Sequence, residues 1–142
     1  MAEVIITRQF RAGIDHVFRY ITQSELILEW WGPEGVTVPV SDLSFDREGP
    51  WMSEMHSPDG RIFKASGQVI RVDPPRALGL TWAWHDDDGT RGHESQVLIE
   101  LEPQGDMTGF KLSHTGLPDA ESAQNHTGGW NSSLDRLERL FP

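Results

Sequence analysis

The sequence predicts an α+β fold in which one antiparallel sheet of about seven strands packs against a long C-terminal helix. Two observations predict it. Between residues 36 and 115, hydrophobic residues recur with a period of two in about six runs that are separated by tight turns. Between residues 119 and 141, the spacing lengthens to the three-and-four pattern of an α-helix. The chain has 142 residues and no cysteine, so we expect one domain spanning residues 1–142, without disulfides.

The N-terminal segment is predicted to form one strand and two short helices. Residues 4–10 alternate well enough for a strand, and Ala12-Gly13 ends it. Hydrophobic residues at helical spacing between residues 14 and 21 predict the first helix. Ser24 is predicted to cap the second helix, which ends at Gly32-Pro33. The hydrophobic residues of this second helix are Leu26, Ile27, Trp30 and Trp31.

The period-two region is predicted to be a meander of six strands. We expect these strands at residues 36–41, 51–56, 63–69, 78–84, 96–102 and 110–114. The turns between them include residues 57–60 and residues 86–89, which contain the Pro, Asp and Gly typical of hairpins. One face of each strand is more hydrophobic than the other, so the sheet should be covered on one side only. The C-terminal helix is the only element left to cover it.

The C-terminal helix is predicted from Asp119, as N-cap, to Phe141. Asp135 and Arg139 are four residues apart and are expected to pair on its solvent face. Its buried stripe is predicted to contain Ala123, Thr127, Trp130, Leu134, Leu137 and Phe141.

Gly128-Gly129 lowers helix propensity in the middle of this segment. One interpretation is that the glycines let another surface approach closely, either a loop or a second subunit in a homodimer. The other is that the helix begins near Asn131 and is preceded by an irregular lid.

Composition and motif spacing exclude several classes of function. A net charge of −10 repels phosphate backbones, which argues against nucleic-acid binding. The six histidines show neither HxH nor HExxH spacing, so no metal site is expected. No phosphate-binding glycine loop is present, and no cofactor is implied. No hydrophobic run is long enough to span a membrane, and the lack of cysteine and of a signal pattern suggests a cytoplasmic protein.

Specific motifs then point to a family. They are Trp30-Trp31-Gly32-Pro33, Ser57-Pro58-Asp59-Gly60, Gly67, Asp73-Pro74-Pro75, Ser113-His114-Thr115-Gly116 and Gly129-Trp130 with Leu134-Asp135-Arg136-Leu137. In their order and spacing they resemble the family named after the activator of Hsp90 ATPase, within the START/Bet v 1-like superfamily. The resemblance covers nearly the whole chain. It implies a helix-grip fold, which is a curved sheet around the C-terminal helix with a cavity between them. It does not by itself establish function.

Strand parity and helix periodicity together predict which residues face that cavity. The candidate ligand-binding residues are Trp51, Ser53, Met55, Phe63, Trp82, Trp84, Val97, His114, His126, Trp130, Asn131 and Leu134. An aromatic wall with a few polar groups is typical of a small-molecule site. The same side chains could instead fill the space as an ordinary core, and that alternative stays open at this point.

Three functional hypotheses follow. The first is binding of a small hydrophobic or amphipathic ligand between sheet and helix. The second, suggested by the superfamily, is a cyclase- or hydrolase-like enzyme with His114 as acid or base, although the favoured interpretation of this histidine is a structural one, with a bond to a neighbouring backbone group. The third, suggested by the family name, is an interaction module that regulates an Hsp90-type chaperone.

Overall fold

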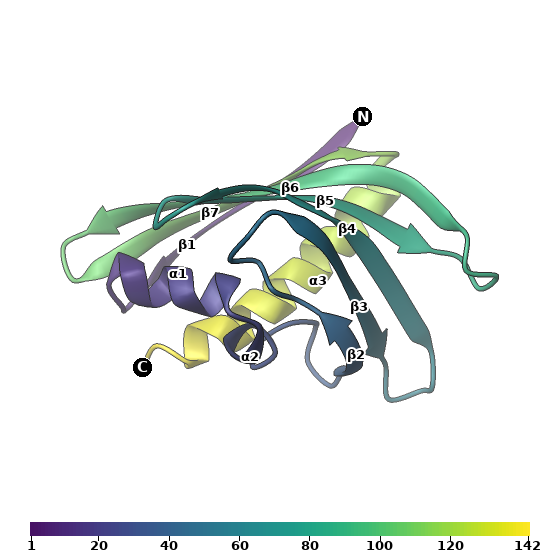
Figure 1. Ribbon diagram of the computed structural model, residues 1–142, viewed down its shortest axis with the longest axis horizontal. Coiled ribbons are helices and arrows are strands. Elements are labelled where there is room, and N and C mark those ends of the chain that lie inside the picture. The colour runs from purple at the N-terminus through teal and green to yellow at the C-terminus, as the bar shows by residue number, and fades with distance from the viewer.

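One antiparallel sheet curves over a long C-terminal helix in the computed structural model, which describes residues 1–142 (Figure 1). The strands, in chain order, are β1 (Ala2–Phe10), β2 (Thr37–Asp42), β3 (Gly49–His56), β4 (Ile62–Asp73), β5 (Ala77–His85), β6 (Arg91–Gln104) and β7 (Met107–Leu117). The helices are α1 (Ile14–Thr22) and α2 (Ser24–Ile27), which both follow β1, and α3 (Ala120–Arg139) at the C-terminus.

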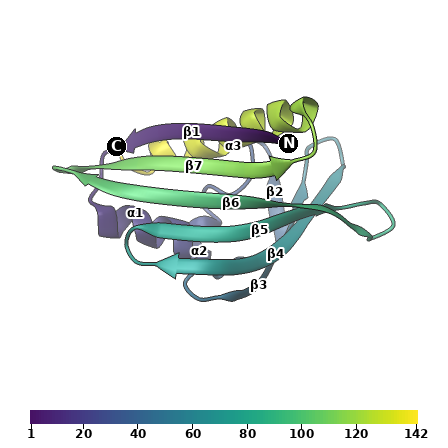
Figure 2. The ribbon, with the colours of Figure 1, turned by 90° about the horizontal axis from the view of Figure 1, so that it is seen from above.

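The order of the strands in the sheet is β1-β7-β6-β5-β4-β3-β2 (Figure 2). Strands β2 to β7 form a meander, because each pairs antiparallel with the strand that precedes or follows it in sequence. β1 adds to the far edge by pairing with β7. The predicted fold class is therefore confirmed, with its seven strands, its long C-terminal helix and two short helices after the first strand.

α3 begins directly after Asp119, the N-cap predicted from the sequence. The side chain of Asp119 accepts a hydrogen bond from the backbone N–H of Ser122 at 2.8 Å, and this N-cap fixes the first turn. The alternative start near Asn131, with an irregular lid before it, is wrong. The buried stripe also differs at one position, because Thr127 is exposed whereas His126 is buried. An imidazole therefore faces the sheet from the first half of the helix.

The C-terminal half of α3 is tied to elements on both sides of it. Arg8 of β1 donates to Asp135 at 2.9 Å and to the side chain of Asn131 at 3.1 Å. Arg136 donates to the carbonyl oxygens of Trp31 and Gly32, at 3.2 and 2.8 Å.

The predicted pair between Asp135 and Arg139 is therefore wrong, since Arg139 pairs with Glu34 instead. Each of these side chains reaches a partner on another element, which helix spacing cannot reveal.

The second short helix is shorter than predicted. α2 ends at Ile27, and its N-cap is Gln23 rather than Ser24, which is the first residue of the helix. Trp30 and Trp31 follow it in irregular structure and are both buried.

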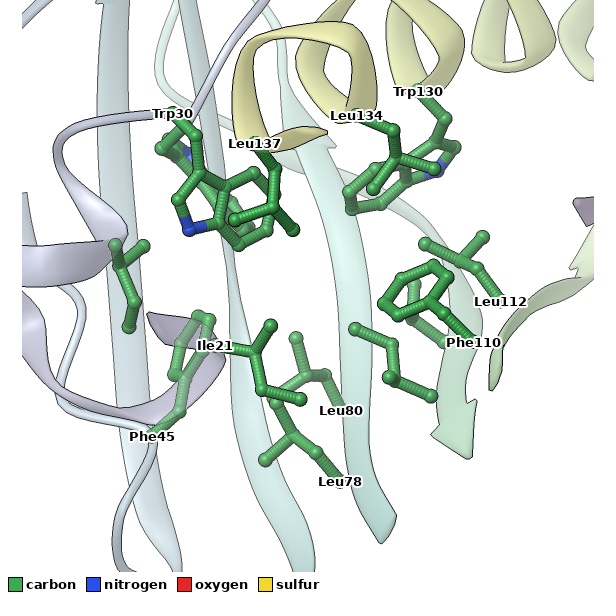
Figure 3. Close-up of a cluster of buried hydrophobic side chains, with 14 of the residues drawn as sticks. Ile21, Trp30, Phe45, Leu78, Leu80, Phe110, Leu112, Trp130, Leu134 and Leu137 are labelled. Carbon is green, nitrogen blue, oxygen red and sulfur yellow. The ribbon is translucent and has the colours of Figure 1, made fainter. Parts of the chain in front are cut away.

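α1 and α2 also help to cover the sheet, which had been predicted to depend on α3 alone. Ile21 and Ile27 are buried in the common core. Figure 3 shows Ile21 near Leu78 and Leu80 of β5, while Leu137 and Trp30 close the space above them. The core thus fills the region under α1, α2 and the second half of α3.

Gly128 is expected to lower the stability of α3 without any packing benefit. It is exposed, and a Cβ atom built on it would meet nothing within 4 Å. Gly128→Ala should therefore raise the free energy of unfolding by about 1 kcal/mol, measured by urea denaturation. A decrease in stability that depends on protein concentration would instead support close approach of a second subunit at this glycine.

Candidate functional site

A cavity of about 690 Å³ opens beside the first half of α3, between the helix, the β3–β4 hairpin and the segment at residues 32–36. Its aromatic and aliphatic walls are formed by Trp31, Pro33, Val36, Met55, Phe63, Trp82, Trp84 and Trp130. Its polar lining is formed by Arg61, Asp119, Glu121, Ser122, Asn125, His126 and Ser133. The cavity is therefore mostly hydrophobic inside, and charged side chains occur among its exposed residues.

Half of the residues predicted from the sequence line this cavity. They are Met55, Phe63, Trp82, Trp84, His126 and Trp130. Five others lie in the packed interior, outside the lining: Trp51, Ser53, Val97, His114 and Leu134. Asn131 differs from the prediction, because it lies outside the lining and its amide oxygen accepts from Arg8. The alternation of residues along each strand predicted that most of these side chains lie on the inner face of the sheet. It does not indicate which of them are packed in the interior and which line the cavity.

Trp31 and Arg61 line the cavity although the sequence analysis did not select them. The indole N–H of Trp31 donates to the hydroxyl of Ser53 at 3.1 Å, which places the ring against β3. Trp31 follows a helix and Arg61 follows a hairpin turn, and neither strand parity nor helix periodicity applies at such positions. Trp31 had been predicted as a hydrophobic residue of the second helix, which instead ends at Ile27.

Trp82 lies at the centre of a cluster of indole rings. Its ring centroid is 5.0 Å from that of Trp51, 5.4 Å from Trp84, 5.5 Å from Trp130 and 5.7 Å from Trp31. Most of these pairs are inclined or edge-to-face, as aromatic rings prefer. Both sequence interpretations hold in part, because Trp51 fills the core while the rings around Trp82 also form the wall of an open space.

His114 supports this wall from behind. It is 0% exposed, and its Nδ1 accepts a hydrogen bond from the indole N–H of Trp130 at 3.1 Å. Since an indole N–H can only donate, the neutral ring carries its proton on Nε2, 2.7 Å from the hydroxyl of Ser95. Ser95 in turn lies 3.3 Å from the carbonyl oxygen of Trp82, to which it donates. Both nitrogens of His114 thus have partners within the protein, Trp130 for Nδ1 and Ser95 for Nε2.

The two buried imidazoles lie against each other. The ring centroids of His114 and His126 are 4.4 Å apart. Burial lowers the pKa of His114 to about 3, and the neighbouring His126 contributes in the same direction. Burial also lowers the pKa of His126. Both rings are therefore uncharged at neutral pH, and the cavity wall carries no positive charge at this point.

The only cationic side chain that lines the cavity is already paired. Arg61 binds Asp59 at 2.9 Å, and its guanidinium carbon lies 5.5 Å from the ring centre of Phe63. Hydrogen bonds from the side chain of Ser57 and the backbone of Arg61 lower the pKa of Asp59, which keeps this partner charged. Asp119 and Glu121 add two carboxylates to the lining. The mouth of the cavity therefore favours cationic or uncharged molecules over anions.

Residues 11–142 match the family described as Activator of Hsp90 ATPase homolog 1-like protein. The chain belongs to this family. An AHSA1 protein from Silicibacter pomeroyi is 42% identical in sequence, and its crystal structure superposes with a TM-score of 0.93 over 97% of this chain and 96% of that chain. The AHSA1-like resemblance inferred from the motifs is thereby confirmed.

More distant structures share the fold. A Staphylococcus epidermidis protein is 25% identical, with a TM-score of 0.80 over 98% of this chain and 88% of that chain. A Chromobacterium violaceum protein is 20% identical, with a TM-score of 0.86 over 99% of this chain and 98% of that chain. No curated protein matches the chain. No helix of this AHSA1-like protein combines the length and hydrophobicity that crossing a membrane requires.

Proposed function

We propose that this AHSA1-like protein binds a small hydrophobic or amphipathic molecule in the cavity between the sheet and the first half of α3. The observation that carries the proposal is an open cavity of about 690 Å³ walled by four indole rings. Ligand-binding cavities in proteins typically measure about 300–1,000 Å³ and are mostly hydrophobic, with a few polar groups that orient the ligand. The cavity meets both conditions.

The arrangement of the walls suggests how such a ligand would lie. Its hydrophobic part would contact Trp82, Trp84 and Trp130, whose rings are held in place by hydrogen bonds and by one another. Its polar end would face the hydroxyl and amide groups of Ser122 and Asn125. Because His114 and Ser95 hold the indole of Trp130 before a ligand arrives, little rotamer entropy would be lost on binding.

The geometry supports this proposal better than the enzymatic alternative. A general acid or base must come within hydrogen-bonding distance of the reacting group. His114 is outside the cavity lining, and both its nitrogens are occupied within the protein. Regulation of a chaperone rests on the family name alone, and no contact in the structure favours it.

A matched pair of variants tests whether the cavity is the binding site. Gly129 lines the cavity, whereas the adjacent Gly128 is exposed with nothing near its Cβ direction. Gly129→Phe should place a ring in the cavity and weaken ligand binding by about tenfold or more. Gly128→Phe makes the same substitution at the adjacent glycine, on the solvent side of the helix, and should leave affinity unchanged.

The measurement is a titration of intrinsic tryptophan fluorescence with a panel of lipids and aromatic metabolites, repeated by native mass spectrometry. Equal affinities for the two variants would place the ligand elsewhere. Failure of every compound to bind the wild-type protein would count against the proposed function itself.

A further inference from the structure

The hydrogen bond between Trp84 and His126 determines where the proton of His126 lies. The indole Nε1 of Trp84 is 3.1 Å from Nε2 of His126. An indole N–H donates and does not accept, so Nε2 must be the nitrogen without a proton. Burial lowers the pKa of His126, which keeps the ring neutral at physiological pH. A neutral ring with an unprotonated Nε2 carries its proton on Nδ1.

This Nδ1–H group has no acceptor within the protein. The only hydrogen bond of the His126 ring is the one that Nε2 accepts from Trp84. The one fully buried side-chain nitrogen or oxygen without a partner is Nε1 of Trp82. Nδ1 of His126 also lacks a partner, so it is not fully buried. Solvent therefore reaches Nδ1, and His126 is a cavity-lining residue that is otherwise buried. The hydrophobic wall thus holds an unpaired donor in a defined place.

Trp82 carries a second unpaired donor, but a ligand in the cavity does not reach it. Its indole nitrogen is buried without a hydrogen-bond partner, and the residue lines the cavity at 5% exposure. Water does not reach this nitrogen, so a molecule in the cavity cannot accept from it, whereas such a molecule can reach Nδ1 of His126. An N–H without an acceptor costs free energy. The Nδ1–H of His126, with no free acceptor on the indole rings around it, therefore selects for a ligand that brings an acceptor.

The charged side chains around the cavity indicate which acceptor group a ligand would carry. The imidazoles of His114 and His126 are neutral, and Arg61 is paired with Asp59. Asp119 and Glu121 would repel a carboxylate as it enters. An uncharged carbonyl oxygen needs no counter-ion and accepts in the direction that an N–H offers.

We propose that the ligand is an uncharged carbonyl compound with an aromatic or other hydrophobic body, and that its carbonyl oxygen accepts the hydrogen bond of His126 Nδ1–H. This inference rests on the proposed function and deepens it. Trp84 acts as a positioning residue, because its own N–H holds the imidazole in the tautomer that donates into the cavity.

Calorimetric titration with three probes of similar shape tests the inference. Benzophenone carries the carbonyl group, diphenylmethane lacks it, and 4-benzoylbenzoate adds a negative charge. We expect benzophenone to bind about tenfold more tightly than diphenylmethane, which is the ratio that one neutral hydrogen bond contributes. We expect 4-benzoylbenzoate to bind more weakly than benzophenone.

Two variants show whether His126 is the donor. Trp84→Phe removes the indole N–H that fixes the tautomer but leaves an imidazole that can still donate, so the preference for benzophenone over diphenylmethane should decrease without disappearing. Trp84→Phe with His126→Phe removes the imidazole as well, without leaving the Trp84 donor behind, and the preference should disappear. Long-range ¹H–¹⁵N spectra of the wild-type protein should show the proton of His126 on Nδ1.

The outcomes separate the two levels of the proposal. If none of the three probes binds, the proposed function fails together with this inference. Equal binding of benzophenone and diphenylmethane would leave the ligand cavity in place but overturn the carbonyl assignment. Retention of the preference in the double variant, or a proton on Nε2, would overturn His126 as the donor. Tightest binding of the charged probe would overturn the assignment of an uncharged ligand.

Discussion

Gly67→Ala is expected to lower the free energy of unfolding by about 3 kcal/mol or more, because it is the one glycine whose Cβ would overlap backbone atoms. A Cβ atom at Gly67 would lie 1.9 Å from the carbonyl oxygen and 2.6 Å from the carbonyl carbon of Thr81. These are backbone atoms of the neighbouring strand, so no side-chain rotation can relieve the overlap. β4 and β5 would have to separate at this point.

The same displacement would reach the cavity wall. Trp51 pairs with Gly67 across β3 and β4, and its indole N–H donates to the carbonyl oxygen of Thr81 on β5 at 3.0 Å. The indole therefore crosses β4 at the one residue that has no side chain. Moving Thr81 would break this hydrogen bond and shift Trp82, the next residue along β5.

Guanidinium denaturation followed by tryptophan fluorescence measures the effect of Gly67→Ala. Gly109→Ala is the matched control, because its Cβ would approach only the side chain of Gln104, which can move away. We expect the control to stay within about 1 kcal/mol of the wild-type protein. A similarly small change for Gly67→Ala would contradict the close approach of the two strands.

Acidification is expected to destabilise the protein through the two buried imidazoles. Burial, with a contribution from His126, lowers the pKa of His114 from 6.5 to about 3, and burial lowers the pKa of His126 too. As the pH falls below 6.5, these histidines become protonated in the unfolded chain while they remain neutral in the folded protein. The stability that the neutral rings contribute is therefore fully present above that pH and is lost progressively toward pH 3.

The expected size of the effect follows from proton linkage. Each imidazole that remains neutral only in the folded state contributes a loss of about 1.4 kcal/mol per pH unit. The free energy of unfolding is measured by urea denaturation at about one-unit steps from pH 7 to pH 4. Carboxylates also contribute to acid denaturation, so the difference between variants, rather than the total slope, reports on the histidines.

Three glutamine variants separate the histidine contribution from the rest. His114→Gln should lower stability at neutral pH, because Trp130 loses the acceptor of its N–H. It should also decrease the slope of the free energy of unfolding against pH, by up to the roughly 1.4 kcal/mol per pH unit that one proton contributes. His126→Gln should make it shallower without touching that hydrogen bond. His16→Gln, at an exposed position, controls for loss of an imidazole. Parallel pH profiles for the wild-type protein and both buried-site variants would contradict the prediction.

The fold was largely predictable because it depends on local and periodic signals. A period of two with Pro, Asp and Gly at the turns specifies consecutive antiparallel strands, and a period of 3.6 after Asp119 specifies the helix. Where a prediction was wrong, a contact between distant segments was responsible. Thr127 was assigned to the buried stripe, but both Thr127 and His126 have helical spacing to Trp130. In the structure His126 is buried and accepts a hydrogen bond from Trp84, whereas Thr127 is exposed.

Local sequence patterns were enough to predict the main elements, their order, the buried face of the sheet and the family to which the chain belongs. Which buried residues border empty space depends on tertiary packing. Met55 and Trp51 share one face of β3, yet Met55 lines the cavity while Trp51 crosses Gly67 and is enclosed. Periodicity indicates the direction of a side chain, whereas a cavity depends on the distance between two packed surfaces. That distance depends on contacts between segments far apart in sequence, such as those that join α3 to β1 and to residues 31–32.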